Sequence, residues 1–183
     1  MNDNPTASKP SPSDELVDVL DDAGRGVGTA TRREMRARRL PHRATYLLVF
    51  NDRDELFVHL RTATKDVYPS HWDVSIGGVV ATGESFDDAA RREAAEEIGV
   101  DLAPERLFPF QFSDDASIVH GMVYRAMHNG PFRLQPEEVV RGDFLPLVEV
   151  AARIARGQFC PDGVAVLREF EHRTASGEFP TRP

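Results

Sequence analysis

The stretch from Gly78 to Val100 decides the fold, and it reads GVVATGESFDDAARREAAEEIGV. Its second half predicts a helix that follows a glycine-containing loop. Ser85 is a favoured N-terminal cap, and Asp88, three residues later, has the spacing of a capping box. Alanines, which are strong helix formers, fill the interior. Gly99 is the residue type that most often ends a helix in the left-handed conformation.

Three glutamates stand near the end of this predicted helix. Glu93, Glu96 and Glu97 occupy positions i, i+3 and i+4, which places their carboxylates on one side of the helix. Glu93 and Glu97 also continue the apolar stripe that starts at Phe86 and Ala90, within an arc of about 100°. Carboxylates on a core-facing side are costly unless they are paired or bind a cation.

The glutamates alone leave two interpretations open, a solvated acidic helix with Arg–Glu pairs or a metal site. The wider spacing favours the metal site, because fixed residue types recur at set intervals: Gly78, Glu84, Arg92, Glu93, Glu96, Glu97 and Gly99. This pattern resembles the Nudix box of the Nudix hydrolases. The one departure is Ala94, where the family usually has a bulkier aliphatic residue, and this difference concerns packing rather than chemistry.

The resemblance implies a role for each residue of the box. It implies three ligands for Mg²⁺ or Mn²⁺, namely the Gly78 carbonyl oxygen and the carboxylates of Glu96 and Glu97, and such hard cations prefer oxygen ligands. It makes Glu93 the candidate general base, and it makes Glu84 and Arg92 a structural pair that ties the loop to the helix. The implied reaction is attack of water on a phosphorus atom of a diphosphate.

The resemblance extends over about residues 40–170, and residues before the box are similar to the branch related to isopentenyl-diphosphate isomerase. They are His42, Arg43, Ala44, Arg61, Lys65, Pro69, Trp72, Asp73, Gly77 and Gly78. In that branch the positions of Arg61 and Lys65 contact the substrate diphosphate. A guanidinium fork and an ammonium point charge suit phosphate oxygens. The alternative is that both are ordinary surface charges.

The isomerase reaction itself fits this sequence poorly. The isomerase uses a cysteine and a glutamate, and the matching positions here hold Gly77 and Met122. His42 matches a metal-binding histidine of the isomerase, yet a lone histidine is more often structural. Glu137 and Glu138 are reserve candidates for a carboxylate that joins the site from outside the box.

Length, charge and cysteine content limit the class of protein. The 183 residues suffice for one domain with its own core, and the formal net charge of −8 argues against non-specific nucleic-acid binding. The basic stretch 32–43 is interpreted as a solvated helix face or a linker. The single cysteine, Cys160, excludes an internal disulfide, is expected to be buried, and suits a cytoplasmic location. No apolar run reaches the roughly 20 residues of a membrane span, and the polar N-terminus does not read as a signal peptide.

The remaining elements predict an α/β fold. Residues 1–13 are expected to be a disordered tail, and 14–183 a single Nudix domain with a hairpin at about 15–30 and the box at 78–100. Strands are predicted at 44–50, 55–60, 107–112 and 117–127, a short strand is expected to start at 144, and helices are predicted at 31–39, 148–156 and 162–172. The resemblance implies a Nudix-type α/β/α sandwich with a mixed central sheet.

Three functions stay open at this point. The first is a metal-dependent hydrolase of a nucleoside diphosphate derivative or a related organic diphosphate. The second is an isomerase-like activity on an allylic diphosphate, and the third is a non-catalytic nucleotide-binding module. The intact box favours the first. Nudix proteins often dimerise, so the resemblance also makes a homodimer a candidate assembly.

Overall fold

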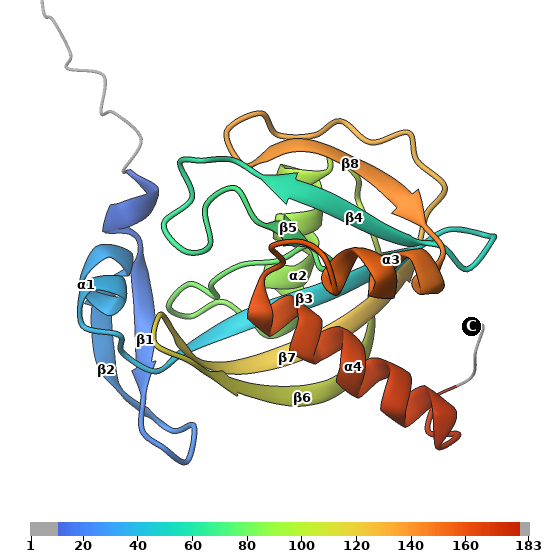
Figure 1. Ribbon diagram of the computed structural model, residues 1–183. Helices are drawn as coiled ribbons and strands as arrows, with labels where there is room; N and C mark the ends of the chain where they lie inside the picture. The colour runs from blue at the N-terminus through green and yellow to red at the C-terminus, as the bar shows by residue number, and fades with distance from the viewer. Residues whose placement is uncertain (1–10, 180–183) are drawn as a thin grey trace, which may run out of the picture.

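The structure is a computed structural model that describes residues 11–179 (Figure 1). Its elements follow one another as η1 (Pro12–Asp14), β1 (Leu16–Leu20), β2 (Gly26–Thr31), α1 (Arg32–Ala37), β3 (His42–Phe50), β4 (Leu56–Arg61), β5 (Trp72–Asp73), α2 (Phe86–Glu97), β6 (Glu105–Ser113), β7 (Ile118–Met127), β8 (Val139–Leu145), α3 (Leu147–Ile154) and α4 (Pro161–Ala175). No helix within this range combines the length and apolar character needed to cross a bilayer.

The main sheet is mixed and has six strands. Its order is β5-β4-β3-β7-β6, and β8 pairs with β4. The β3 and β7 strands run parallel over their whole length, whereas the other pairs are antiparallel. The β1–β2 hairpin forms a separate two-stranded sheet beside the start of β3. The sheet therefore has the mixed character expected from a chain in which strands and helices interleave.

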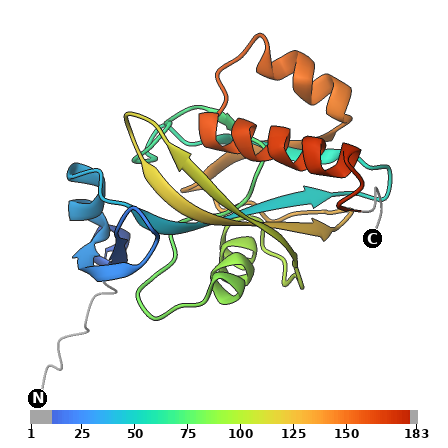
Figure 2. The ribbon, with the colours of Figure 1, turned by 90° about the horizontal axis from the view of Figure 1, so that it is seen from below.

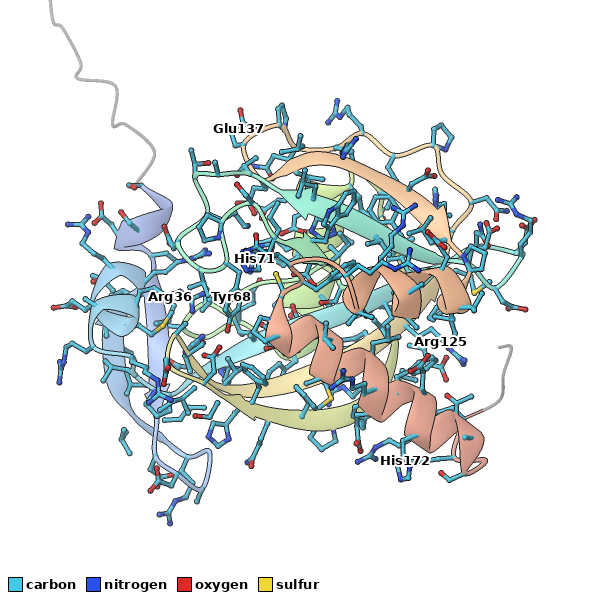
Figure 3. The ribbon with its side chains drawn as sticks, viewed as in Figure 1. Arg36, Tyr68, His71, Arg125, Glu137 and His172 are labelled. Atoms are coloured by element: carbon cyan, nitrogen blue, oxygen red, sulfur yellow. The ribbon has the colours of Figure 1, made fainter. Side chains whose placement is uncertain are left out.

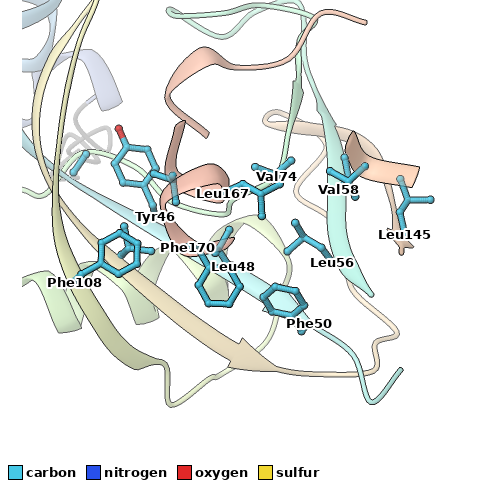
Figure 4. Close-up of a cluster of buried hydrophobic side chains, with 14 of the residues drawn as sticks. Tyr46, Leu48, Phe50, Leu56, Val58, Val74, Phe108, Leu145, Leu167 and Phe170 are labelled. Carbon is cyan, nitrogen blue, oxygen red and sulfur yellow. The ribbon is translucent and has the colours of Figure 1, made fainter. Parts of the chain in front are cut away.

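Helices cover both faces of the main sheet (Figure 2). Side chains on β3 alternate between two cores, as expected for a strand buried on both faces. Leu48 and Phe50 join the cluster that contains Phe170 of α4 (Figure 4). Leu47 and Val49 join the cluster beneath α2. This arrangement confirms the predicted α/β/α sandwich.

Two expectations about particular elements are wrong. Residues 1–10 of the expected disordered tail lie outside the described residues, but Pro12–Asp14 form a turn of 3₁₀ helix. The strand expected to begin at Phe144 instead ends at Leu145, after starting at Val139. Its pairing with β4 explains the greater length, because Leu145 lies opposite Leu56 and Val139 opposite Arg61.

Candidate functional site

Helix α2 carries two glutamates toward the core and one toward solvent. The Ser85 Oγ accepts a hydrogen bond from the Asp88 amide at 3.1 Å, which caps the helix start as predicted. Glu93 and Glu97 are only 7% and 2% exposed. The Glu96 side chain is 53% exposed. Glu93 and Glu97 therefore continue the buried stripe of the helix, as predicted, whereas the Glu96 carboxylate lies at its solvent edge.

Arg92 joins the loop to the helix. Its Nε lies 2.8 Å from Glu84 Oε1 and its Nη2 lies 3.0 Å from Glu84 Oε2, so the pair is bidentate. Its Nη1 reaches Glu93 Oε1 at 2.8 Å and Glu96 Oε2 at 3.1 Å. The Ala81 amide also donates to Glu84. One guanidinium thus fixes the loop and orients Glu93, as a bidentate Arg–carboxylate pair can do.

Gly77, just before the box, and Gly78, its first residue, allow close contacts within the protein. A Cβ on Gly77 would lie 2.1 Å from the Thr45 carbonyl oxygen, and a Cβ on Gly78 would lie 2.4 Å from Glu93 Oε1. The Gly78 carbonyl, a predicted metal ligand, accepts a hydrogen bond from the Thr45 amide at 2.9 Å. A carbonyl oxygen has a second lone pair, which leaves the predicted role open to it.

Gly78→Ala is expected to lower activity sharply, because the added methyl group must displace the Glu93 carboxylate. Glu93 is the predicted general base, and displacement of such a group by about 1 Å costs on the order of 10²-fold in rate. The measurement is kcat/KM with Mg²⁺ for the variant and for a Gly28→Ala control, whose Cβ would meet nothing within 4 Å. Equal rates for Gly78→Ala and the wild type would contradict the contact between Gly78 and Glu93.

Lys65 and Arg61 lie beside the box but have partners from the protein. The Lys65 ammonium contacts Glu138 and lies 3.7 Å from Glu97 Oε1. Arg61 Nη1 lies 3.6 Å from Asp73 Oδ2, and its Nη2 donates to the Val67 carbonyl at 3.0 Å. The fold thus brings Lys65 onto the carboxylates, where the sequence alone predicted only a contact to substrate.

Of the two reserve carboxylates, the structure brings Glu138 to the site. Glu137 is exposed, and Figure 3 shows it at the outer edge of the molecule. The Glu138 side chain is 31% exposed and faces Lys65 and Glu97. A spacing argument could not choose between these neighbours, because the choice depends on how the segment before β8 packs against Lys65.

The carboxylates of this site suit a hard divalent cation. Burial raises the pKa of Glu97 well above its usual range and also raises the pKa of Glu93. Glu97 Oε2 is buried and has no hydrogen-bond partner. Oxygen donors of this kind are the ligands that Mg²⁺ prefers. In residues 11–179 no three His, Cys, Asp or Glu side chains converge as a ready metal cage, and the Lys65 ammonium provides the positive charge next to Glu97 and Glu138.

A polar hollow adjoins Gly78 and extends toward α1 and α4. Its lining includes Arg32, Arg36, Tyr46, Asp162 and His42. Tyr46 donates a hydrogen bond to Asp162 at 3.2 Å, and burial raises the Asp162 pKa to about 6. His42 is buried, its Nδ1 lies 2.9 Å from the Leu40 carbonyl oxygen, and burial lowers its pKa to about 4. A neutral, buried ring with a backbone partner agrees with the structural interpretation of this histidine.

The structure corrects the interpretation of the basic stretch 32–43 at two residues of this hollow, Arg32 and Arg36. The basic stretch 32–43 was expected to be a solvated face or a linker, and Arg33 and Arg38 are indeed exposed. Arg32 and Arg36 instead line the hollow, four residues apart on one face of α1. No sequence pattern predicted that Asp162 would line the hollow. The buried state expected for Cys160 is confirmed.

Comparison with known proteins gives a consistent family. The NUDIX domain model matches residues 40–171. A Nudix hydrolase of Streptomyces coelicolor, SCO1686, is 42% identical over 91% of this chain and 94% of its own length. The Nudix hydrolase YfcD of Escherichia coli is 36% identical over 91% of this chain and 92% of its own length.

A solved structure shares the fold of this chain. The crystal structure of DR0079 from Deinococcus radiodurans matches with a TM-score of 0.75 and 27% identity, and the match covers 85% of this chain and 98% of that one. Nudix hydrolases generally use divalent metal ions, which agrees with the buried carboxylates of α2. With its box, its sandwich and its relatives in agreement, this chain belongs to the Nudix family of hydrolases, enzymes that act on phosphorus-containing anhydrides.

Proposed function

We propose that this protein is a divalent-metal-dependent hydrolase that cleaves the diphosphate linkage of a nucleoside diphosphate derivative or a related organic diphosphate. One observation carries the proposal: two carboxylates of α2 are buried, Glu93 against Gly78 and Glu97 near Glu138. Buried carboxylates are strongly unfavourable unless a cation compensates them. A metal ion bound between these carboxylates would compensate their charge and so offset the free-energy cost of burying them.

The proposed metal ligands for Mg²⁺ or Mn²⁺ are the Gly78 carbonyl, Glu96 and Glu97, with Glu138 as a further ligand from outside the box. A bound divalent ion offsets charge on phosphate oxygens and lowers the pKa of bound water. Glu93 is the proposed proton acceptor. Arg92 holds Glu93 Oε1 at 2.8 Å, so Oε2 is the oxygen left to receive the proton of the attacking water.

Arg61 and Lys65 are the proposed contacts to the substrate diphosphate. Arg61 Nε is buried without a hydrogen-bond partner, which leaves a donor for a phosphate oxygen. Lys65 has three donors on a flexible stem, so its ammonium can serve the box carboxylates or the diphosphate. The branch related to isopentenyl-diphosphate isomerase uses the same two positions for its diphosphate. The hydrolase proposal shares this mode of binding but not the isomerase chemistry, since Gly77 and Met122 supply neither an acid nor a base.

A substrate screen tests this proposal directly. The pure protein is incubated with Mg²⁺ or Mn²⁺ and with nucleoside di- and triphosphates, nucleotide sugars, dinucleotide cofactors or isopentenyl diphosphate. Metal-dependent release of phosphate or of a nucleoside monophosphate is the expected result. Conversion of isopentenyl diphosphate into an acid-labile product at about 1 s⁻¹ or faster would instead establish an isomerase. Nucleotide binding without turnover in every class would establish a non-catalytic module.

A further inference from the structure

Four cationic side chains line the hollow beside the box, together with the acidic Asp73 and Asp162. Arg32, Arg36, Arg61 and Lys65 line this hollow, and the same four line a second hollow that adjoins it. Three of them have an acidic partner. Arg61 lies 3.6 Å from Asp73, Lys65 contacts Glu138, and Arg32 lies 3.9 Å from Glu15. The fourth cation, Arg36, differs from them.

Arg36 is compensated at longer range by Asp66 and Asp162 rather than by a direct ion pair. Across residues 11–179 no carboxylate lies within ion-pair distance of its guanidinium, and its Nη1 donates to Ser117 Oγ at a long 3.4 Å. Its Nε is buried and has no partner. Burial, together with the charge of Arg32, lowers the Arg36 pKa to about 10, so the side chain stays cationic at neutral pH. A partly buried cation with unused donors is an unfavourable arrangement that a bound anion would relieve.

Arg36 and Arg61 reach the shared hollow from different elements, α1 and β4. Arg61 ends β4, whereas Ser117, the partner of Arg36, directly precedes β7. The β4 and β7 strands flank β3 on opposite sides in the sheet. Figure 3 shows Arg36 on α1 facing the region of Tyr68, which lines the same hollow. Arg36 therefore approaches the hollow from the β7 side, whereas Lys65 and Glu138 line the adjoining second hollow together with it.

We propose that Arg36, with Arg32 beside it, binds an anionic group of the substrate that is additional to the diphosphate. The group is a phosphate or a carboxylate, because the guanidinium fork matches both. This inference rests on the proposed diphosphate hydrolysis and narrows its substrate class to organic diphosphates that carry a further negative charge. Both arginines precede residue 40, where the match to the family model begins. The subsite is thus built by a part of the chain outside the common domain.

The test is calorimetric titration of inorganic phosphate into protein saturated with Mg²⁺ and methylenediphosphonate, a diphosphate that cannot be hydrolysed. The diphosphonate fills the diphosphate site, so further phosphate binding reports the second subsite. Arg36→Gln is expected to weaken phosphate binding about tenfold or more relative to the wild type. Arg38→Gln removes the same charge from an exposed position next to α1 and is expected to bind like the wild type. Malonate in place of phosphate distinguishes a carboxylate from a phosphate as the preferred group.

Several outcomes would overturn the inference. Equal phosphate affinity for Arg36→Gln and the wild type would do so, as would the absence of phosphate binding once the diphosphonate is bound. Thermal unfolding gives an independent readout, because loss of a largely buried charge without a direct ion pair should leave the midpoint of Arg36→Gln, or of the apolar Arg36→Met, equal or higher. A lower midpoint in both would assign Arg36 a structural role. Neither assay involves turnover, so failure of the hydrolase proposal would show separately, in the substrate screen.

Discussion

Glu97→Gln is expected to reduce Mg²⁺-dependent hydrolysis by about 10²–10³-fold without unfolding the protein. The Glu97 carboxylate is 2% exposed, and its Oε2 has no hydrogen-bond partner. An amide keeps the shape of the side chain but supplies no anionic oxygen for a divalent ion. Steady-state kinetics on the substrate found by the screen measure the effect. Glu149→Gln, an exposed carboxylate in an i,i+4 pair with Arg153 on α3, is the matched control and should leave the rate unchanged.

The same variant makes a prediction about stability. Burial raises the pKa of Glu97, so the folded protein binds this proton more tightly than the unfolded chain does. Glu97 therefore makes its full contribution to the free energy of unfolding at pH values below the usual glutamate pKa of about 4.3. This contribution is lost as the pH rises through the pKa of Glu97 in the folded protein. At pH 7 to 8 without metal, Glu97→Gln should thus have a thermal midpoint equal to or above that of the wild type. Added Mg²⁺ should raise the midpoint of the wild type but not of the variant, and an equal rise in both would refute the metal assignment.

Glu93→Gln is expected to lower kcat by roughly 10² or more while KM stays close to the wild-type value. A glutamine can still accept the hydrogen bond from Arg92, which now joins Nη1 to Glu93 Oε1 at 2.8 Å, but it cannot take a proton from water. Mg²⁺ should still raise the thermal midpoint of this variant, in contrast to Glu97→Gln. If only KM changes, Glu93 is a binding residue, and Glu138 becomes the next candidate for the proton acceptor.

Local signals predicted the central helix and its environment well. Ser85 accepts the capping hydrogen bond, and Gly99 adopts a positive φ of 71° just beyond the helix end. These features depend on residues within a few positions of each other, so the sequence contains all that is needed. Burial of Glu93 and Glu97 also followed from their alignment with the apolar stripe. Glu96 lies at the margin of that stripe, and only packing shows that it faces solvent.

The contacts that complete the site are long-range, and the sequence could not show them. Lys65 and Glu138 meet because β8 pairs with β4 and brings Val139 opposite Arg61. Solvent-facing polar residues, such as Arg141, interrupt β8 and concealed its first half in the sequence. The sequence also could not show which face of α1 is buried. Its arginines are of one residue type, and only the packing of the helix in the fold shows which of them line the hollow.

The β1–β2 hairpin and α1 form a unit of their own. All six strands of the main sheet begin at or after His42. A small apolar cluster of Val17, Met35 and Val79 attaches the unit to the residue that follows Gly78. Substitutions in the first forty residues can therefore reshape one wall of the hollow while the glutamates of α2 keep their places. On the proposed function, recognition by Arg32 and Arg36 and chemistry at α2 belong to different parts of the chain, so relatives that share the box can diverge in substrate preference through changes in the N-terminal unit alone.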